Sequence, residues 1–506
     1  RLFKIFSFKK ISKGYLKITM LSGFEIVEKW NLLNAIATIP LATILFSSLL
    51  YLGNNFAKIF LNDFNSDLKA GVGFCFFLLF ISIILFTLSV FGVMNSEILI
   101  SVLAVLFPIG ILSIIKHIKD IKVICKRITE NNSSFSIFLI LFILFLSLLI
   151  ALLPTTKMDE ISYHMLLPLR IINDGIILPY SIPWEASLLP QLIYQLFFTP
   201  FFLIGFPEVA NVFSFFLFIY SAFLIQRLCE SIFKVQIPII FVSLIFFSGL
   251  FVVVDIITIS SSSLAVFSSV LSFGTLIHVA GRNHNLNINS SISLAISLLT
   301  LVISKITMLP LVFFSWAFYC YWIFKCNTSI NKVNNLIVSG LIPLAIYSHV
   351  LILTYYVYGS PFGSMFGDFF KSSYVVYDPY AQSAGQTLKV YETIFLSVTK
   401  FNPFIWIFTF ICSILLIKTK YKFLIAIFTF QFFIIILFLP EKPRHFQGIQ
   451  LVLASFVIAF IFTKFQKNFN LFISLGNVVT SMYAVLILYY SAPLIYYGYF
   501  TSNNYF

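Results

Sequence analysis

The sequence predicts an all-α polytopic membrane protein with about 13–14 transmembrane helices. Of its 506 residues, 60% are hydrophobic and only 10% are charged, and the mean hydropathy is +1.01. Soluble proteins carry roughly 25% charged residues. Windows of about 20 apolar residues recur along the chain, and each is long enough to cross a bilayer as a helix. The two-residue alternation of barrel strands is missing, so helices are the expected spanning elements.

The net charge of +14 has an explanation that does not involve nucleic acid. Most Lys and Arg residues stand in short segments between apolar runs, where positive charge sets the orientation of membrane helices. We therefore expect a lipid bilayer as a partner and no nucleic acid. The six cysteines lie in or beside apolar segments without metal-ligand spacing, which predicts small buried side chains and no disulfides.

The first 134 residues are predicted to form a basic arm followed by three apolar spans. The arm covers residues 1–36 and resembles an interfacial segment, and the apolar runs fall at 37–52, 70–93 and 96–115. A basic loop is expected over 116–134, and the positive-inside rule assigns it to the cytoplasm. Counting back through three spans puts the arm outside, against that rule, so 37–52 could instead be re-entrant. These extra spans could also dock a membrane-protein partner.

A helix over 135–153 then carries the chain to the outer face at Asp159. Residues 189–206 are apolar but contain Pro190 and Pro200, and a span there would reverse the orientation of every later loop. We therefore predict short amphipathic helices within an outer region, 154–207, and a second outer loop at 359–401. The later helices are expected at 208–227, 236–254, 256–279, 290–304, 306–324, 336–358, 403–417, 422–439, 449–463 and 471–497. Residues 466–506 are predicted to form a C-terminal span and tail.

This topology brings ionisable residues from four parts of the chain to one face of the membrane. They are Asp159, Glu160, His164, Asp255, Lys305, Arg444 and His445. Such convergence indicates a site, although charges in a membrane protein gather at its two faces in any case.

Each of these residues also has a simpler interpretation. The Asp159–Glu160 pair could be a solvated loop, and Asp255 could cap a helix. Lys305 could anchor a helix end by extending its ammonium group to the interface, and Arg444 with His445 could form a solvated turn. His164 could be an interfacial imidazole or a metal ligand. A third ligand is not evident, so a divalent metal remains an alternative and no metal residue is assigned.

The stretch Met158-Asp-Glu-Ile-Ser-Tyr-His-Met-Leu-Leu-Pro168, followed by Arg170, resembles the first outer loop of GT-C-fold glycosyltransferases. These polyprenyl-phosphate-sugar-dependent enzymes include protein mannosyltransferases and lipid A aminoarabinose transferases. Three further elements follow in the family's order: Asp255 before a Ser-rich helix, Ser304-Lys305-Ile-Thr-Met-Leu-Pro310, and Arg444-His445-Phe446. The resemblance covers about 135–465 and implies a GT-C-like transmembrane core there. His445 departs from the family, which often has Tyr at that position.

The resemblance implies a multi-pass enzyme of the cytoplasmic membrane with its active site facing outside. It would move a sugar from a polyprenyl-phosphate carrier to a hydroxyl of a lipid or glycan acceptor, with inversion. Asp159 would be the general base, aided by Glu160 and His164, while Lys305, Arg444 and His445 would bind the donor phosphate. Asp255, Tyr163 and Arg170 would support the site. A non-catalytic membrane subunit and a lipid or glycan transporter are the competing classes.

Overall fold

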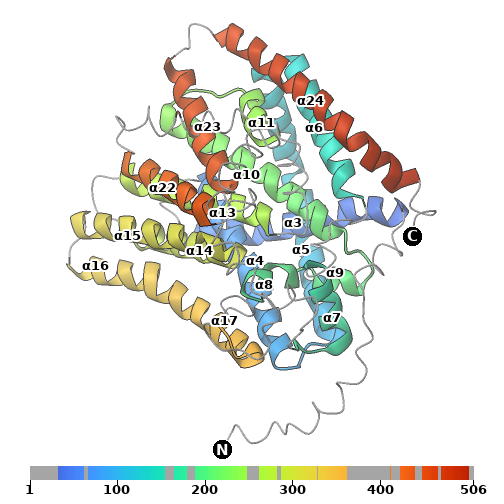
Figure 1. Cartoon of the computed structure of the whole chain (residues 1–506), viewed down its shortest axis with the longest axis vertical. Coiled ribbons are helices and arrows are strands. Elements are labelled where there is room, and N and C mark those ends of the chain that lie inside the picture. Colours follow the sequence, from blue (N-terminus) through green and yellow to red (C-terminus); the bar gives the residue numbers. More distant parts are fainter. Residues whose placement is uncertain are drawn as a thin grey trace, which may run out of the picture.

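The computed structural model describes residues 32–61, 66–153, 164–178, 189–247, 261–281, 287–326, 329–361, 411, 422–438, 447–464 and 469–500. The described residues form helices and no strand, which confirms the predicted all-α class. Eight of the described helices are long and apolar enough to cross a membrane, and four shorter apolar helices accompany them. The protein is therefore a polytopic membrane protein (Figure 1).

Where it is described, the first half of the chain contains four long helices followed by three short ones. The helices up to the start of the central bundle are α3 (Leu32–Phe60), α4 (Ser66–Val90), α5 (Ser96–Asn131), α6 (Ser134–Ala151), α7 (Leu166–Asp174), α8 (Leu189–Leu196) and α9 (Thr199–Leu203).

The second half is almost continuously helical where it is described. Its elements are α10 (Val209–Phe233), α11 (Ile239–Phe247), α13 (Ser262–Gly281), α14 (Ile288–Ser304), the 3-10 turn η5 (Ile306–Met308), α15 (Leu309–Cys326), α16 (Ser329–Leu336), the π-helical turn η6 (Ile337–Leu341), α17 (Ile342–Tyr358), α22 (Lys422–Phe438), α23 (Gln447–Lys464) and α24 (Phe469–Phe500). The expected helix at 403–417 lies outside the described residues except for position 411.

One expectation for the N-terminal region is wrong. The segment 116–131 continues α5 as helix instead of forming a loop, because it contains no Gly or Pro and its isoleucines recur at helical spacing between lysines. Asn95 caps the start of this helix: its Oδ1 accepts a hydrogen bond from the backbone N–H of Ile98 at 2.9 Å. The re-entrant alternative for 37–52 is excluded, because α3 is one continuous helix of 29 residues that is long and apolar enough to span a membrane.

The predicted interruption at 189–206 is confirmed. The eight residues of α8 and the five of α9 are far fewer than the roughly 20 that a spanning helix needs. Pro200 stands in the first turn of α9, where its missing N–H removes no helical hydrogen bond.

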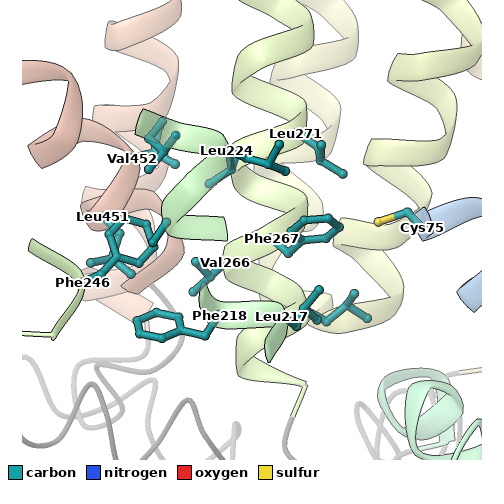
Figure 2. Close-up of a cluster of buried hydrophobic side chains, with 14 of the residues drawn as sticks. Cys75, Leu217, Phe218, Leu224, Phe246, Val266, Phe267, Leu271, Leu451 and Val452 are labelled. Carbon is teal, nitrogen blue, oxygen red and sulfur yellow. The ribbon is translucent and has the colours of Figure 1, made fainter. Parts of the chain in front are cut away.

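The core of the molecule is built around α13, whose residues are nearly all buried. Figure 2 shows side chains of α10, α13 and α23 meeting there, with Phe267 of α13 between Leu217, Leu224 and Cys75. The Phe267 ring meets that of Phe74 edge to face, with centroids 5.6 Å apart. The serines and glycines of α13 suit such an interior, because they let helices approach closely without a large side chain between them.

The first two helices belong to this same core. Phe74 and Cys75 of α4 are fully buried in it, and α3 packs against both α4 and α10. Gly53 of α3 and Gly73 of α4 touch backbone to backbone, so a Cβ atom on Gly73 would collide with the carbonyl of Gly53. Cys75 and Cys229 are free and buried, as predicted for small apolar side chains.

Candidate functional site

Lys305 lies at a break between two helices. α14 ends at Ser304, Lys305 has extended backbone angles (φ −153°, ψ 123°), and η5 and α15 follow. Its side chain is only 4% exposed, and Nζ donates a hydrogen bond to Ser262 Oγ at 3.1 Å. The ammonium group therefore turns into the protein, in contrast to the interfacial anchor that was the simpler interpretation. Ser262 is one of its partners.

A serine that directly precedes α13 fixes the end of α14 beside this lysine. Ser261 Oγ donates a 2.6 Å hydrogen bond to the backbone oxygen of Ser304. The last carbonyl groups of a helix have no partner within the helix, so a hydroxyl that satisfies one of them holds the helix end in place. Consecutive serines thus position both the helix terminus and the charged side chain that follows it.

His164 lies inside the protein and is held by α8. It is 6% exposed, and Gln195 Nε2 is 2.9 Å from its Nδ1 atom. The amide of Gln195 holds the imidazole ring in place through this hydrogen bond. The histidine that follows the predicted catalytic carboxylates therefore has a buried partner.

Tyr194 connects α8 to the bundle. Its hydroxyl is 3.4 Å from Ser214 Oγ of α10. Burial raises the pKa of Tyr194 well above its ordinary value, and the hydrogen bond with Ser214 only partly opposes the shift. The phenol therefore stays protonated and can donate.

Two sets of buried polar side chains are here together called the polar layer. In the first set, adjacent residues of α8 contact His164 and Ser214 of α10, and in the second set Ser262 of α13 binds Lys305. The layer consists of His164, Tyr194, Gln195, Ser214, Ser262 and Lys305. The two sets are connected through the packing of α8 against α14, the helix that Lys305 follows.

Six predicted site residues lie outside the described residues. They are Asp159, Glu160, Tyr163, Asp255, Arg444 and His445. The outer loop 359–401 also lies outside them, apart from residues 359–361, as does much of 154–207. Arg170 is described: it lies on α7, half-buried, six residues after His164.

The helix that follows Arg444 and His445 starts against α13. Gly448 in the first turn of α23 packs so closely that a Cβ atom would lie 2.9 Å from Ser269 Oγ and 3.1 Å from the Ala265 oxygen. α23 therefore begins within two turns of Ser262 along α13.

Sequence reasoning did not identify Tyr194, Gln195, Ser214 or Ser262. Polar residues inside apolar segments were the available signal, because a buried polar group in a membrane protein needs a partner.

Glu208 was also missed. It directly precedes α10, is 5% exposed, and burial raises its pKa from 4.5 to about 7. Two features marked it in the sequence: an acidic residue beside an apolar run, and a Gly-Phe-Pro turn before it.

Within the described part of the chain, no three His, Cys, Asp or Glu side chains gather as a metal site would require. No family model matches this chain, and neither curated proteins nor solved structures give a significant match.

Proposed function

We propose that this protein is a membrane glycosyltransferase that moves a sugar from a polyprenyl-phosphate carrier to an acceptor hydroxyl with inversion. The reaction takes place at the outer face of the cytoplasmic membrane. The observation that carries the proposal is the polar layer, in which buried Lys305 and buried His164 each have a polar partner on another helix, Ser262 of α13 and Gln195 of α8. A cation is seldom kept inside a membrane protein without a task, because its desolvation is costly.

Lys305 takes the role of donor-phosphate ligand. In the transferase reaction the bond between the anomeric carbon and the phosphate oxygen breaks, and negative charge builds on the lipid phosphate. A preorganised ammonium group in a site that excludes water stabilises that charge strongly. Ser262 orients the ammonium group, and the extended backbone at Lys305 directs it away from both helix axes. Arg444 and His445 complete the phosphate site.

Asp159 takes the role of general base. It removes the proton from the acceptor hydroxyl as the oxygen attacks the anomeric carbon, a contribution typically worth about 10²–10⁴ in rate. Glu160 and His164 orient the acceptor and tune Asp159, with Tyr163, Arg170 and Asp255 in support. His164 follows Asp159 by only five residues, and an extended chain advances at most about 3.6 Å per residue. Covalent connection thus limits the distance between the Cα atoms of Asp159 and His164 to about 18 Å.

The deciding experiment compares cell-envelope glycolipids and glycans by mass spectrometry. Cells with the wild-type gene, a deletion, Asp159→Asn and Lys305→Met are analysed together, with membrane levels of each variant checked by immunoblot. The transferase proposal predicts that the deletion and both substitutions lose the same sugar, whose mass identifies the donor sugar and the acceptor together.

A different result would favour the competing classes. If the deletion changes the profile while Asp159→Asn leaves it intact at normal protein levels, the chemistry is not at Asp159. The protein would then act as a transporter or as a subunit of a larger complex. Uptake of labelled glycolipid into vesicles that contain the purified protein separates those two.

A further inference from the structure

A long apolar groove runs between α15 and α22, away from the polar layer. It has a volume of about 1060 Å³ and is lined by carbon-rich side chains together with two lysines. The two helices lie side by side in Figure 1. Ala317 of α15 and Ala426 of α22 line the groove, and their small side chains leave it open.

The groove has an aromatic end and a charged end. At the aromatic end the rings of Phe314 and Phe430 meet with centroids 5.4 Å apart, and Gln431 Nε2 donates a 3.1 Å hydrogen bond to the Thr307 oxygen. At the other end stand Lys325 in the last turn of α15 and Lys422 in the first turn of α22. The two helices are therefore antiparallel, and both ammonium groups lie at the same end of the groove.

Both lysines are exposed, and their contacts are with aromatic rings. Lys325 Nζ is 5.0 Å from the centroid of the Trp322 ring, and Lys422 Nζ is 5.4 Å from that of Phe423. Among the described residues neither lysine forms an ion pair with a carboxylate. Two positive charges thus lie at one end of the apolar groove without an acidic partner from the described chain.

The dimensions of the groove match one leaflet of a bilayer. Eleven residues separate Phe314 from Lys325, which is about 16 Å along a helix at 1.5 Å per residue. Half of a hydrocarbon core of about 30 Å is about 15 Å. The positive-inside rule assigns this end of α15 and α22 to the cytoplasmic side, where the leaflet carries anionic lipids.

We propose that this groove binds one anionic glycerophospholipid, with an acyl chain between α15 and α22 and the headgroup phosphate between Lys325 and Lys422. The lipid differs from the sugar donor in position and in role, because the groove's charged end is the end away from Thr307 and Lys305. Anionic headgroups are favoured over zwitterionic ones because two ammonium groups attract the net negative charge. Bound lipid would fill the trough and hold α22 against α15.

Trp322 provides a direct probe because it lines the groove. The full chain is reconstituted in mixed micelles with phosphatidylglycerol or phosphatidylcholine that carries brominated acyl chains, which quench a tryptophan they touch. The signal of Trp322 is the difference between the protein and its Trp322→Phe variant. We expect strong quenching by brominated phosphatidylglycerol at a few lipids per protein, and weak quenching by brominated phosphatidylcholine.

Variants of the lysines and of the groove floor test the geometry. Lys325→Gln and Lys422→Gln should each weaken phosphatidylglycerol binding about fivefold, and Ala317→Phe should abolish quenching by filling the trough. Lys464→Gln is the matched control, since Lys464 also ends a helix beside a phenylalanine, with Nζ 5.8 Å from the Phe460 ring. Monodisperse elution on gel filtration confirms that each variant is folded.

Three results would overturn the proposal. Equal quenching by the two lipids would show an unspecific contact with the bilayer. A loss of binding in Lys464→Gln as large as that in Lys325→Gln would show a general effect of charge. The absence of quenching by either lipid would show that the groove is closed to acyl chains.

Discussion

Lys305 Nζ and Ser262 Oγ are 3.1 Å apart although 43 residues separate them in the chain. The contact joins the break between α14 and α15 to the first residue of α13, and it holds a buried ammonium group between these helices. Because the serine orients the lysine, both residues should affect the same step of the proposed reaction.

Lys305→Met should lower the transfer rate by about 10²–10³, the usual cost of removing one group that stabilises developing charge. Ser262→Ala should lower it about tenfold, because a hydrogen bond to a charged group is worth about 1.5 kcal/mol. Ser272→Ala is the matched control: Ser272 is buried on the same helix, and its hydroxyl makes no hydrogen bond within the described chain. Rates are measured with purified protein and the donor identified from the envelope analysis. Full activity in folded Lys305→Met would contradict the phosphate role.

Gln195→Glu should change the pH dependence of transfer rather than only its rate. A carboxylate in place of an amide that lies 2.9 Å from His164 Nδ1 favours the charged imidazole. Activity that depends on neutral His164 falls as the pH is lowered and the ring becomes charged. In the glutamate variant this fall should therefore begin at a pH roughly one unit higher than in wild type. Gln195→Met keeps the side-chain volume and should lower the rate without this shift. Identical pH–rate profiles for wild type and Gln195→Glu would show that His164 has no part in the rate-limiting step.

Glu208→Gln should remove a pH-dependent loss of stability. Burial raises the pKa of Glu208 from 4.5 in its ordinary state to about 7, so the folded protein holds this proton more tightly than the unfolded chain. The associated stability is fully present below pH 4.5, falls as the pH rises to about 7, and is absent above that. At pH 8 the glutamine variant should therefore be more stable by about 3 kcal/mol.

The measurement for Glu208 is thermal unfolding in detergent between pH 4.5 and pH 8. The two proteins should melt together at the acidic end and separate on the alkaline side, with the variant higher. Glu97→Gln, which changes an exposed carboxylate in the first turn of α5, serves as the control. A difference in melting temperature between the two proteins that stays constant from pH 4.5 to pH 8 would show that titration of the Glu208 carboxyl group does not cause it.

Gly73→Ala should destabilise the N-terminal helix pair. The added Cβ atom would meet the backbone of Gly53, which cannot move aside as a flexible side chain could, and such overpacking costs about 1–3 kcal/mol. Gly281→Ala is the matched control because a Cβ atom at this position, the end of α13, would meet nothing within 4 Å; it should be neutral or slightly stabilising. Melting temperatures in detergent compare the two. A Gly73→Ala protein as stable as wild type would mean that α3 and α4 can move apart to accommodate the Cβ atom without any loss of stability.

The membrane class and most helix positions could be predicted from the sequence. Apolar runs of about 20 residues define spanning helices because every backbone polar group must be satisfied within the helix itself. The prolines of 189–206 marked the interruption that α8 and α9 form. The end of α5 could not be predicted from charge alone, since a segment rich in lysine and isoleucine can be a loop or an amphipathic helix.

The sequence by itself determined that the chain is a helical membrane protein and that Lys305 interrupts an apolar run. Only the tertiary structure decided which way that lysine turns and what it meets, because α13, α14 and α8 come together through packing between residues far apart in the chain. Tyr194, Gln195 and Ser262 carry no distinguishing local pattern, and their importance follows from burial beside His164 and Lys305. In an environment without water, a polar side chain must find its partner on another helix, and the packing of the helices determines which partner that is.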